Sequence, residues 1–304
     1  MSSDLSYDSR WGEVREEVRL SLQNRLRELG LPEEVYSRIS RGGRLNRAVL
    51  FLMVANPDAE KRKRRVAVDL AVALEMIHKA SVIRDDIEDA DFLRRGLPTE
   101  RAIMGVPGAL ALSDVLLTGG LAVIQRLEPA AIKRVLNALL NMSRGQFCDL
   151  QGPLAPEDPF GIAELKTGSL VALVFWMGGL HADRSRGDRR LLHTMGMHLG
   201  TAFQLANDVN NVTRNEGRGK LPGSDLAEHR NSAISQLIDQ QAGEFPDAVE
   251  SSIDLAVERT CLEIARRLGE AKRIASLLKC PLPEGIHLLV SDEKTARSFV
   301  GDQQ

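Results

Sequence analysis

The chain has 304 residues, 43% of them hydrophobic, so it can bury a large core as one large domain or two ordinary ones. Its 40 basic and 42 acidic residues leave a formal net charge of −2, which excludes a global field attracting nucleic acid or an anionic membrane. Three widely spaced cysteines without a C-x-x-C pattern argue against a disulfide framework or a zinc site.

The predicted elements are almost all helices, because apolar residues recur at helical spacing and the alternation typical of strands is scarce. Helices are predicted over residues 10–29, 33–40, 44–55, 61–90, 108–126, 129–150, 159–182, 187–213, 225–242 and 247–278. Short breaks marked by proline or glycine separate them, and no strand is predicted. We expect an all-α protein with a single domain over residues 1–304.

Two of these helical segments, 66–83 and 191–212, are apolar around most of their circumference, which is typical of helices enclosed by other helices. Each has an unusual polar motif at its end, so we expect one bundle with a polar pocket between two central helices. The N-terminus is polar, and the longest uncharged runs, 167–182 and 191–207, are too short for a membrane span. We therefore expect a cytoplasmic protein without stable membrane insertion.

A cluster of carboxylates follows the first central segment. On a helix Asp85 and Asp89 share one face, flanked by Asp86 and Glu88, and like charges at this spacing repel each other. A hard cation such as Mg²⁺, which takes carboxylate and phosphate oxygens and keeps several waters, would relieve that repulsion. The alternative is a solvated acidic helix end, which is the commoner fate of such a string.

Two arginines a few residues later favour the metal site. Arg94 and Arg95 follow the acidic cluster within a short turn. Guanidinium groups bind phosphate oxygens through two parallel hydrogen bonds. The acidic and basic groups could therefore hold the same diphosphate, through the metal and directly.

The stretch 75–99, which contains both groups, strongly resembles the first aspartate-rich region of the trans-isoprenyl diphosphate synthases, without a gap. Further matches occur in the family's order, at Gly42-Gly43-Arg44-Leu45-Asn46-Arg47, Ser113-Asp114, Gly145-Gln146 with Asp149, Lys166-Thr167-Gly168, Phe203-Gln204, and Gly219-Lys220 with Gly223-Ser224-Asp225-Leu226. Together they cover about residues 40–235. The resemblance implies an all-α bundle around a central cavity, a homodimer, and the joining of an allylic diphosphate to isopentenyl diphosphate.

Carried over position by position, the resemblance implies Mg²⁺ as cofactor, held on the allylic diphosphate by Asp85 and Asp89 with Asp86 beside them. Arg94 would contact that diphosphate directly. The residues implied for the homoallylic diphosphate are Arg44, Arg47, His78 and Arg95. Those implied to steady the leaving group and the developing carbocation are Lys166, Thr167, Gln204 and Lys220, and Arg230 stands where the family often has a further lysine that binds substrate.

The chain departs from the family at the second aspartate-rich motif. Asn207 and Asn211 replace two carboxylates there and leave Asp208, and a neutral amide oxygen is a weaker magnesium ligand. Asn207, Asn211 and Asn215 also share one helical face, a spacing similar to the metal triad of class I terpene cyclases, although Glu216 falls one residue beyond the expected carboxylate. The motif therefore retains a weaker predicted metal set.

Three hypotheses follow. The first is a prenyltransferase that makes a longer trans-prenyl diphosphate, favoured by the retained homoallylic set; the small Ala80 and Ser81 before the aspartates leave room for a product of about geranylgeranyl length. The second is a terpene-cyclase-like enzyme that ionises a single prenyl diphosphate. The third is a regulatory, non-catalytic subunit of a prenyl diphosphate synthase.

Overall fold

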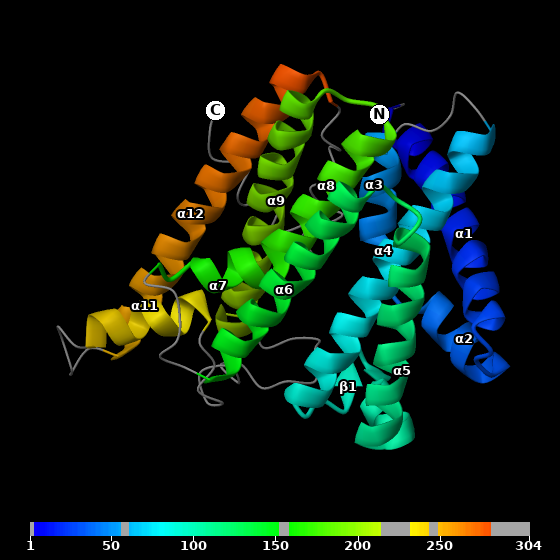
Figure 1. Ribbon diagram of the computed structural model, residues 1–304. Coiled ribbons are helices and arrows are strands. Elements are labelled where there is room, and N and C mark those ends of the chain that lie inside the picture. Colours follow the sequence, from blue (N-terminus) through cyan, green and yellow to red (C-terminus); the bar gives the residue numbers. More distant parts are fainter. Residues whose placement is uncertain (1–2, 56–60, 152–157, 214–231, 243–248, 281–304) are drawn as a thin grey trace. The chain divides into compact units, whose positions relative to one another are not determined.

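The computed structural model describes residues 3–55, 61–151, 158–213, 232–242 and 249–280 (Figure 1). These residues are almost entirely helical, which confirms the predicted all-α class. They divide into two compact units. Unit 1 comprises the described parts of residues 1–132 with 177–184, and unit 2 comprises those of 133–176, 185–216 and 220–304. The single domain predicted over residues 1–304 stays a prediction.

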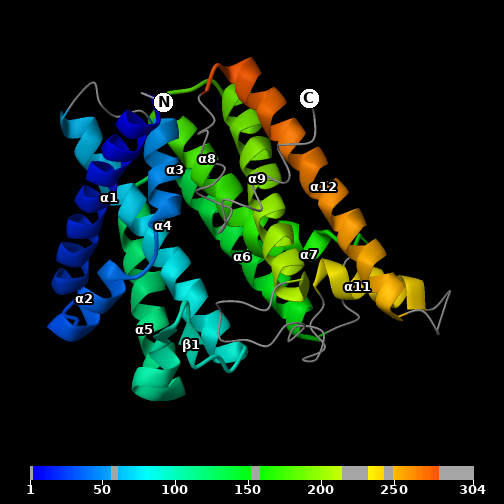
Figure 2. The ribbon, with the colours of Figure 1, turned by 180° about the vertical axis from the view of Figure 1, so that it is seen from behind.

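Unit 1 is built around a long central helix. Its helices are α1 (Ser3–Glu28), α2 (Glu33–Arg41), α3 (Asn46–Ala55), α4 (Lys61–Glu88) and α5 (Glu100–Ile124). Helices α4 and α5 run side by side in both views (Figures 1 and 2). Every residue from 70 to 77 of α4 is buried, so all sides of the helix are covered. The predicted enclosure of residues 66–83 is thus confirmed for residues 70–77, whereas Val66 at the start of the segment is exposed.

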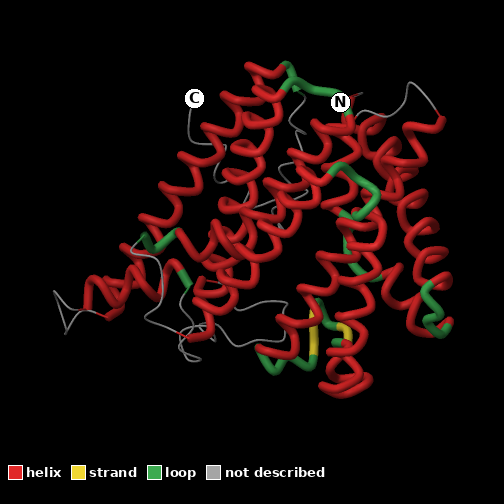
Figure 3. Tube along the Cα trace, viewed as in Figure 1, coloured by secondary structure: helices red, strands yellow, loops and turns green. Residues whose placement is uncertain are grey.

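A short hairpin that the sequence did not predict follows α4 (Figure 3). Strands β1 (Leu93–Arg94) and β2 (Leu97–Pro98) pair antiparallel, with Arg94 opposite Leu97. Both residues of the connecting turn have positive φ, 54° at Arg95 and 76° at Gly96, as the type I′ hairpin turn requires. Strands of two residues are too short to show alternation, which is why the hydrophobic pattern gave no sign of them.

Helix α5 begins eight residues earlier than predicted. Thr99 caps its N-terminus by accepting a hydrogen bond from the backbone N–H of Ala102 at 3.2 Å. The helix kinks at Gly105, whose φ is 72°, and Pro107 follows. The predicted helix started only at residue 108, whereas the structure has helix on both sides of the kink.

Unit 2 contains residues 133–151 of helix α6 (Pro129–Gln151) and two long packed helices, α9 (Arg186–Thr213) and α12 (Val249–Leu278). Helices α9 and α12 lie side by side (Figures 1 and 2). Helix α11 (Ala233–Ala242) is shorter, and residues 225–231 of the predicted helix 225–242 lie outside the described residues. The predicted helix 159–182 is one continuous helix in three segments, of which the first and last are α-helical and the middle one is a π-helix. It runs from α7 (Gly161–Ala163) through a π-helix, η2 (Glu164–Gly168), into α8 (Ser169–His181).

Two helical stretches are long and apolar enough to cross a membrane by length and composition alone, 100–124 and 161–181. Of the apolar window in the second, 78% is buried inside the protein, as in the core helix of a globular protein, and the figure for the first is 44%. The first was not among the uncharged runs considered from the sequence, because Glu100 and Arg101 open its helix and Asp114 interrupts it.

Glycines let α9 approach the π-helix. A Cβ added at Gly200 would lie 2.8 Å from Val171 Cβ, 2.9 Å from Gly168 Cα and 3.0 Å from the carbonyl oxygen of Thr167. We therefore expect Gly200→Ala to lower the free energy of unfolding by about 1–3 kcal/mol, the usual cost of overpacking. Urea denaturation followed by circular dichroism measures it.

The matched control is Gly269→Ala in α12, where an added Cβ would meet nothing within 4 Å. Alanine forms helix better than glycine, so this variant should raise the free energy of unfolding by about 0.5–1 kcal/mol. Equal effects of the two substitutions would contradict the close approach at Gly200.

Candidate active site

Several cations gather around His78 on α4 in unit 1. Burial lowers the pKa of His78 well below its usual 6.5, and the nearby charges of Arg47, Lys79, Arg94 and Arg95 lower it further. Arg47 shows the same crowding, because burial and then Arg95 lower its pKa while Glu75 opposes them. Such an assembly of positive charge favours an anionic ligand with several oxygens, such as a diphosphate.

A buried carboxylate fixes one side of this cluster. Glu75, only 2% exposed, accepts hydrogen bonds from the backbone N–H groups of Arg47 at 3.0 Å and Ala48 at 3.2 Å. It thereby satisfies donors in the first turn of α3 and sets the place of Arg47. One turn later, Lys79 Nζ donates to the carbonyl oxygen of Gly42 at 2.5 Å. Helix α4 therefore holds the loop and helix start over residues 42–48 from two points.

A second buried carboxylate fixes the hairpin. Arg94 Nε donates to Asp86 Oδ1 at 2.6 Å, and the Asp86 side chain is 5% exposed. Burial raises the pKa of Asp86, and the ion pair with Arg94 opposes that shift. Burial alone would lower the pKa of Arg94, but Asp86 raises it. Asp86 and Arg94, predicted as a metal ligand and a diphosphate contact, are thus paired with each other.

Asp85 and Asp89 suit a magnesium ion shared with a substrate. The helical hydrogen bond from the Asp89 N–H to the Asp85 carbonyl oxygen, 2.8 Å, keeps both residues one turn apart, and both are half-buried. Among the described residues, no three His, Cys, Asp or Glu side chains gather into a metal cage. Mg²⁺ commonly takes one or two protein carboxylates plus substrate phosphates and waters, so this pair fits it.

Arg84, where the family usually has histidine, is held by α5. Its Nε donates to Ser113 Oγ at 3.1 Å, and its guanidinium pairs with Asp114. The match at Ser113-Asp114, which had no role in the sequence analysis, therefore meets the residue just before the first aspartate. The pair links α4 to α5 next to the acidic cluster.

In unit 2 the predicted catalytic side chains form two polar chains. Lys166 Nζ, on the π-helix, pairs with the 8% exposed Asp149 of α6 at 2.8 Å. Thr167 Oγ1 donates to Gln204 Oε1 at 2.6 Å, and Gln204 Nε2 donates to Asp208 Oδ1 at 2.9 Å. Asp208 is 7% exposed. The structure thus brings Lys166 and Thr167 into fixed contact with the residues of α6 and α9 that the motifs contained.

Backbone packing supports these chains. A Cβ added at Gly145 of α6 would lie 2.5 Å from the backbone nitrogen of Lys166, so only glycine allows α6 to lie against the π-helix here. Asn207 and Asn211 are half-buried on α9 on either side of Asp208. The altered motif therefore occupies the same turns of α9 as Gln204 and Asp208.

Not every predicted site residue joins these groups. Arg44 is exposed in the loop before α3, where its carbonyl oxygen accepts from Arg15 Nε at 3.3 Å. Lys220 and Arg230 lie outside the described residues, as do Asn215 and Glu216. The ligand and catalytic roles assigned from the sequence stay predictions.

Sequence reasoning missed three residues that organise the site. Glu75 and Lys79 stand in the first motif without a role, and Asp149 was named only as a match. Their signal was a charged residue on an otherwise apolar helix face, since such residues are seldom buried unless paired.

The sequence matches the polyprenyl synthetase family over residues 31–253. It is 31% identical to the farnesyl diphosphate synthase of Bacillus subtilis over 224 residues, 68% of this chain and 75% of that protein. It is 28% identical to heptaprenyl diphosphate synthase component 2 of Geobacillus stearothermophilus over 287 residues, 91% of this chain and 88% of that protein.

Solved structures share the fold. A heptaprenyl diphosphate synthase from Staphylococcus aureus superposes with a TM-score of 0.78 at 19% identity, covering 95% of this chain and 98% of that one. An octaprenyl pyrophosphate synthase from Helicobacter pylori gives 0.76 at 20% identity, covering 95% and 99%. Together with the sequence match, the helical fold defines a prenyltransferase of the isoprenyl diphosphate synthase class. The chain belongs to the polyprenyl synthetase family.

The lowered pKa of His78 predicts a pH dependence of stability. The unfolded chain binds a proton on this ring near pH 6.5, whereas the folded protein binds it only at lower pH. The stability contributed by the neutral ring is therefore present above pH 6.5 and is lost as the pH falls through the folded pKa. Between about pH 7 and 5, the free energy of unfolding should decrease by at most about 1.4 kcal/mol per pH unit for this proton.

Denaturant titrations of the wild type and His78→Gln at several pH values measure this contribution. His181, His193 and His198 also have lowered pKa values, mainly from burial, and add to the slope in both proteins. The difference between the two proteins therefore isolates His78. Identical slopes would contradict the half-buried, cation-crowded setting of this ring.

Proposed function

We propose that this protein condenses an allylic prenyl diphosphate with isopentenyl diphosphate to give a longer trans-prenyl diphosphate, with Mg²⁺. The observation that carries the proposal is the group of cations around His78 on the same helix as Asp85 and Asp89. An enzyme with two diphosphate substrates needs positive charge for one diphosphate beyond what a metal ion supplies for the other.

The proposed division of labour in unit 1 follows from charge. Asp85 and Asp89 would hold Mg²⁺, which neutralises the charge that develops on the allylic diphosphate as it leaves. Arg94 stays oriented by Asp86 at the edge of that site. Arg47, His78 and Arg95, with Arg44 in the preceding loop, would bind the isopentenyl diphosphate.

In unit 2 the proposed groups orient and stabilise. Lys166 would carry positive charge toward the leaving diphosphate, and Asp149 fixes the place of its ammonium group. Thr167 and Gln204 would direct oxygen dipoles toward the developing carbocation, with Asp208 holding the Gln204 amide. Lys220 and Arg230 complete the proposed set, and residues 207, 208 and 211 form the proposed second, weaker metal site.

The finer features are also proposals. A product of about geranylgeranyl length agrees with the small Ala80 and Ser81 in α4, the first of them 2% exposed. A homodimer is supported by apolar side chains that are exposed along α6 and, at 100° per residue, fall on one face of that helix: Leu136, Leu140, Phe147 and Leu150. We also propose a cytoplasmic location.

One assay tests the reaction. The purified protein is incubated with Mg²⁺ and dimethylallyl, geranyl, farnesyl or geranylgeranyl diphosphate, with and without isopentenyl diphosphate. Longer diphosphates that form only when isopentenyl diphosphate is present are the expected result. Hydrocarbon or alcohol from one allylic substrate alone would support the cyclase-like alternative, to which the asparagines of α9 point. No turnover, with stimulation of an added prenyl diphosphate synthase, would support a regulatory subunit instead.

Asp85→Ala tests the metal assignment. Without this carboxylate the charge on the leaving diphosphate is poorly neutralised, so kcat should fall by about a thousandfold. Glu88→Gln, an exposed acid at the end of the same helix, is the matched control and should keep kcat within about twofold. Steady-state kinetics at several Mg²⁺ concentrations measures both, and normal activity of Asp85→Ala would refute the assignment.

Asn207→Asp tests the second metal site. A carboxylate binds Mg²⁺ more strongly than an amide, so the variant should reach half-maximal activity at about tenfold lower Mg²⁺ if Asn207 contacts a metal. A magnesium titration of the elongation rate measures this shift. An unchanged midpoint would place Asn207 outside the metal site, and loss of a native product would mean that the amide itself is required.

A further inference from the structure

We propose that Arg267 of α12 is a positioning residue that holds the π-helix bearing Lys166 and Thr167 in its catalytic register. This inference rests on the proposed function of those two residues. It gives a role to the region after about residue 240, in which the sequence showed no recognisable motif.

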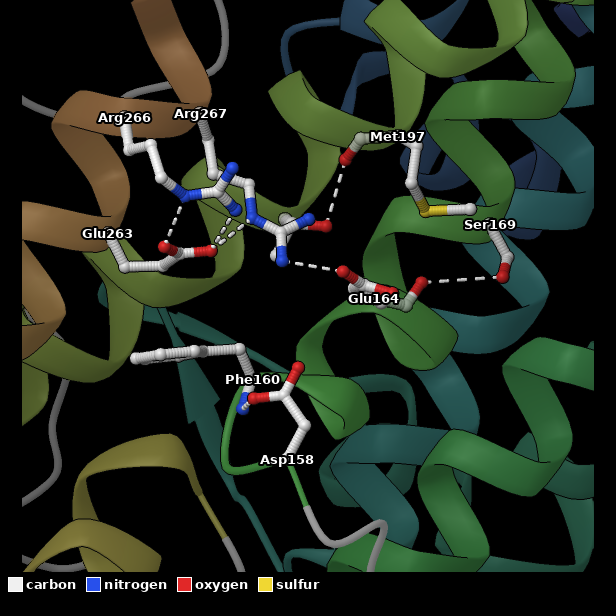
Figure 4. Close-up of polar contacts among 9 residues, drawn as sticks. Asp158, Phe160, Glu164, Ser169, Met197, Glu263, Arg266 and Arg267 are labelled. Carbon is white, nitrogen blue, oxygen red and sulfur yellow. Dashed lines mark hydrogen bonds and ion pairs between the residues drawn. The ribbon is translucent and has the colours of Figure 1, made fainter. Parts of the chain in front are cut away.

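The contact is a bridge that a buried arginine makes between two elements far apart in the sequence (Figure 4). Arg267 is 4% exposed, and its guanidinium lies between two carboxylates. Its terminal nitrogen pairs with Glu164 Oε1 at 2.5 Å, and its Nε pairs with Glu263 Oε1 at 2.6 Å. A buried guanidinium that bridges two acids in this way fixes both at once.

Glu164 is the first residue of the π-helix. Its carbonyl oxygen accepts the backbone N–H of Ser169, the bond between residues five apart that defines the π winding. Its carboxylate pairs with Arg267. The start of the π-helix is therefore held by a backbone hydrogen bond within its own helix and by an ion pair from α12. A π winding is rare and occurs mostly as single turns at functional sites. The ion pair with Arg267 gives this winding a support from outside the helix.

Comparison with the neighbouring Arg266 shows that the ion pair with Glu164 belongs to Arg267. Arg266 makes two contacts with Glu263, at 2.7 and 2.6 Å, and its side chain is 55% exposed. Burial would raise the pKa of Glu263, but the hydrogen bonds from Arg266 and Arg267 hold it lowered. Glu263 thus has one arginine already, and what Arg267 adds is the link to the π-helix.

For catalysis, the π-helix matters because it sets the directions in which the Lys166 and Thr167 side chains point. Lys166 lies two residues and Thr167 three residues after Glu164, and each makes its polar contact to a different helix, α6 or α9. If the start of the π-helix relaxed toward ordinary α winding, the directions of both side chains would change together. Loss of Arg267 should therefore disturb the chemical step more than the binding of isopentenyl diphosphate, whose proposed contacts are in unit 1.

The test compares Arg267→Met with Arg266→Met, a matched pair of adjacent arginines. Because Arg267→Met alone leaves the half-buried Glu164 carboxylate without this partner, the double variant Glu164→Gln/Arg267→Met removes both charges and protects the fold. Two quantities are measured in each protein: amide hydrogen exchange of residues 161–170 without substrate, and kcat and KM for both substrates.

For Arg267→Met and the double variant we expect faster exchange over residues 161–170. We also expect kcat to be lower by about ten- to a hundredfold, the range for losing a group that orients catalytic side chains, with the KM for isopentenyl diphosphate within about twofold. Arg266→Met should leave exchange and kcat unchanged. Arg267→Lys, which keeps the charge but lacks the fork, should recover part of kcat.

Native exchange over residues 161–170 in the double variant would overturn the inference whether or not the protein transfers prenyl groups, because that measurement needs no substrate. Faster exchange with an unchanged kcat would overturn the positioning role. If the wild type forms no elongated product, the proposed function fails by itself, and the role of Arg267 in catalysis fails with it, while exchange still shows whether it holds the π-helix.

Discussion

The mutual repulsion of the cations around His78 is the constraint on which the arrangement of unit 1 depends. A partly buried group of like charges would separate if the backbone allowed it. Helix α4 prevents this with two buried acids, Glu75 and Asp86, which are eleven residues apart and therefore on nearly the same side of the helix. Glu75 holds the start of α3, and Asp86 holds the hairpin through Arg94. The site is charged before any ligand arrives, so a diphosphate would relieve repulsion as it binds.

The same principle operates in unit 2 on a smaller scale. Two of the groups proposed to act on substrate are oriented by buried carboxylates: Lys166 by Asp149, and the amide of Gln204 by Asp208. Buried charges of this kind contribute little net stability compared with apolar packing, but their removal one at a time is costly. What they contribute is the orientation of the side chains that they contact. They leave the functional atoms few rotamers and thus reduce the ordering that substrate binding would otherwise have to supply.

The helices, the central place of α4 and the family were readable from the sequence, because apolar periodicity and long ungapped motifs are local signals. Contacts between elements were not readable. Nothing in the sequence indicates that Asp86 pairs with Arg94 rather than binding a metal. Glu164 and Arg267, which also pair, are over a hundred residues apart in the sequence. The π winding was hidden as well, since its composition is that of an ordinary helix. Local pattern identifies which residues matter, whereas the partner of each one is decided by tertiary packing.

The hairpin between α4 and α5 fixes the spacing between the acidic cluster and the two arginines. Its loop has only two residues, and each has the positive φ that such a tight turn demands. Arginine is uncommon in that backbone conformation, which asparagine and glycine adopt with less strain. At Arg95 the chain therefore has a positive charge where an uncharged residue would form the turn more easily. A loop with no spare residue also tolerates no insertion, because one extra residue would change the pairing of Arg94 and turn the next side chains to other faces. The number of residues between the acidic cluster and the two arginines is therefore itself a chemical parameter, and relatives that change it are expected to recognise their diphosphate differently.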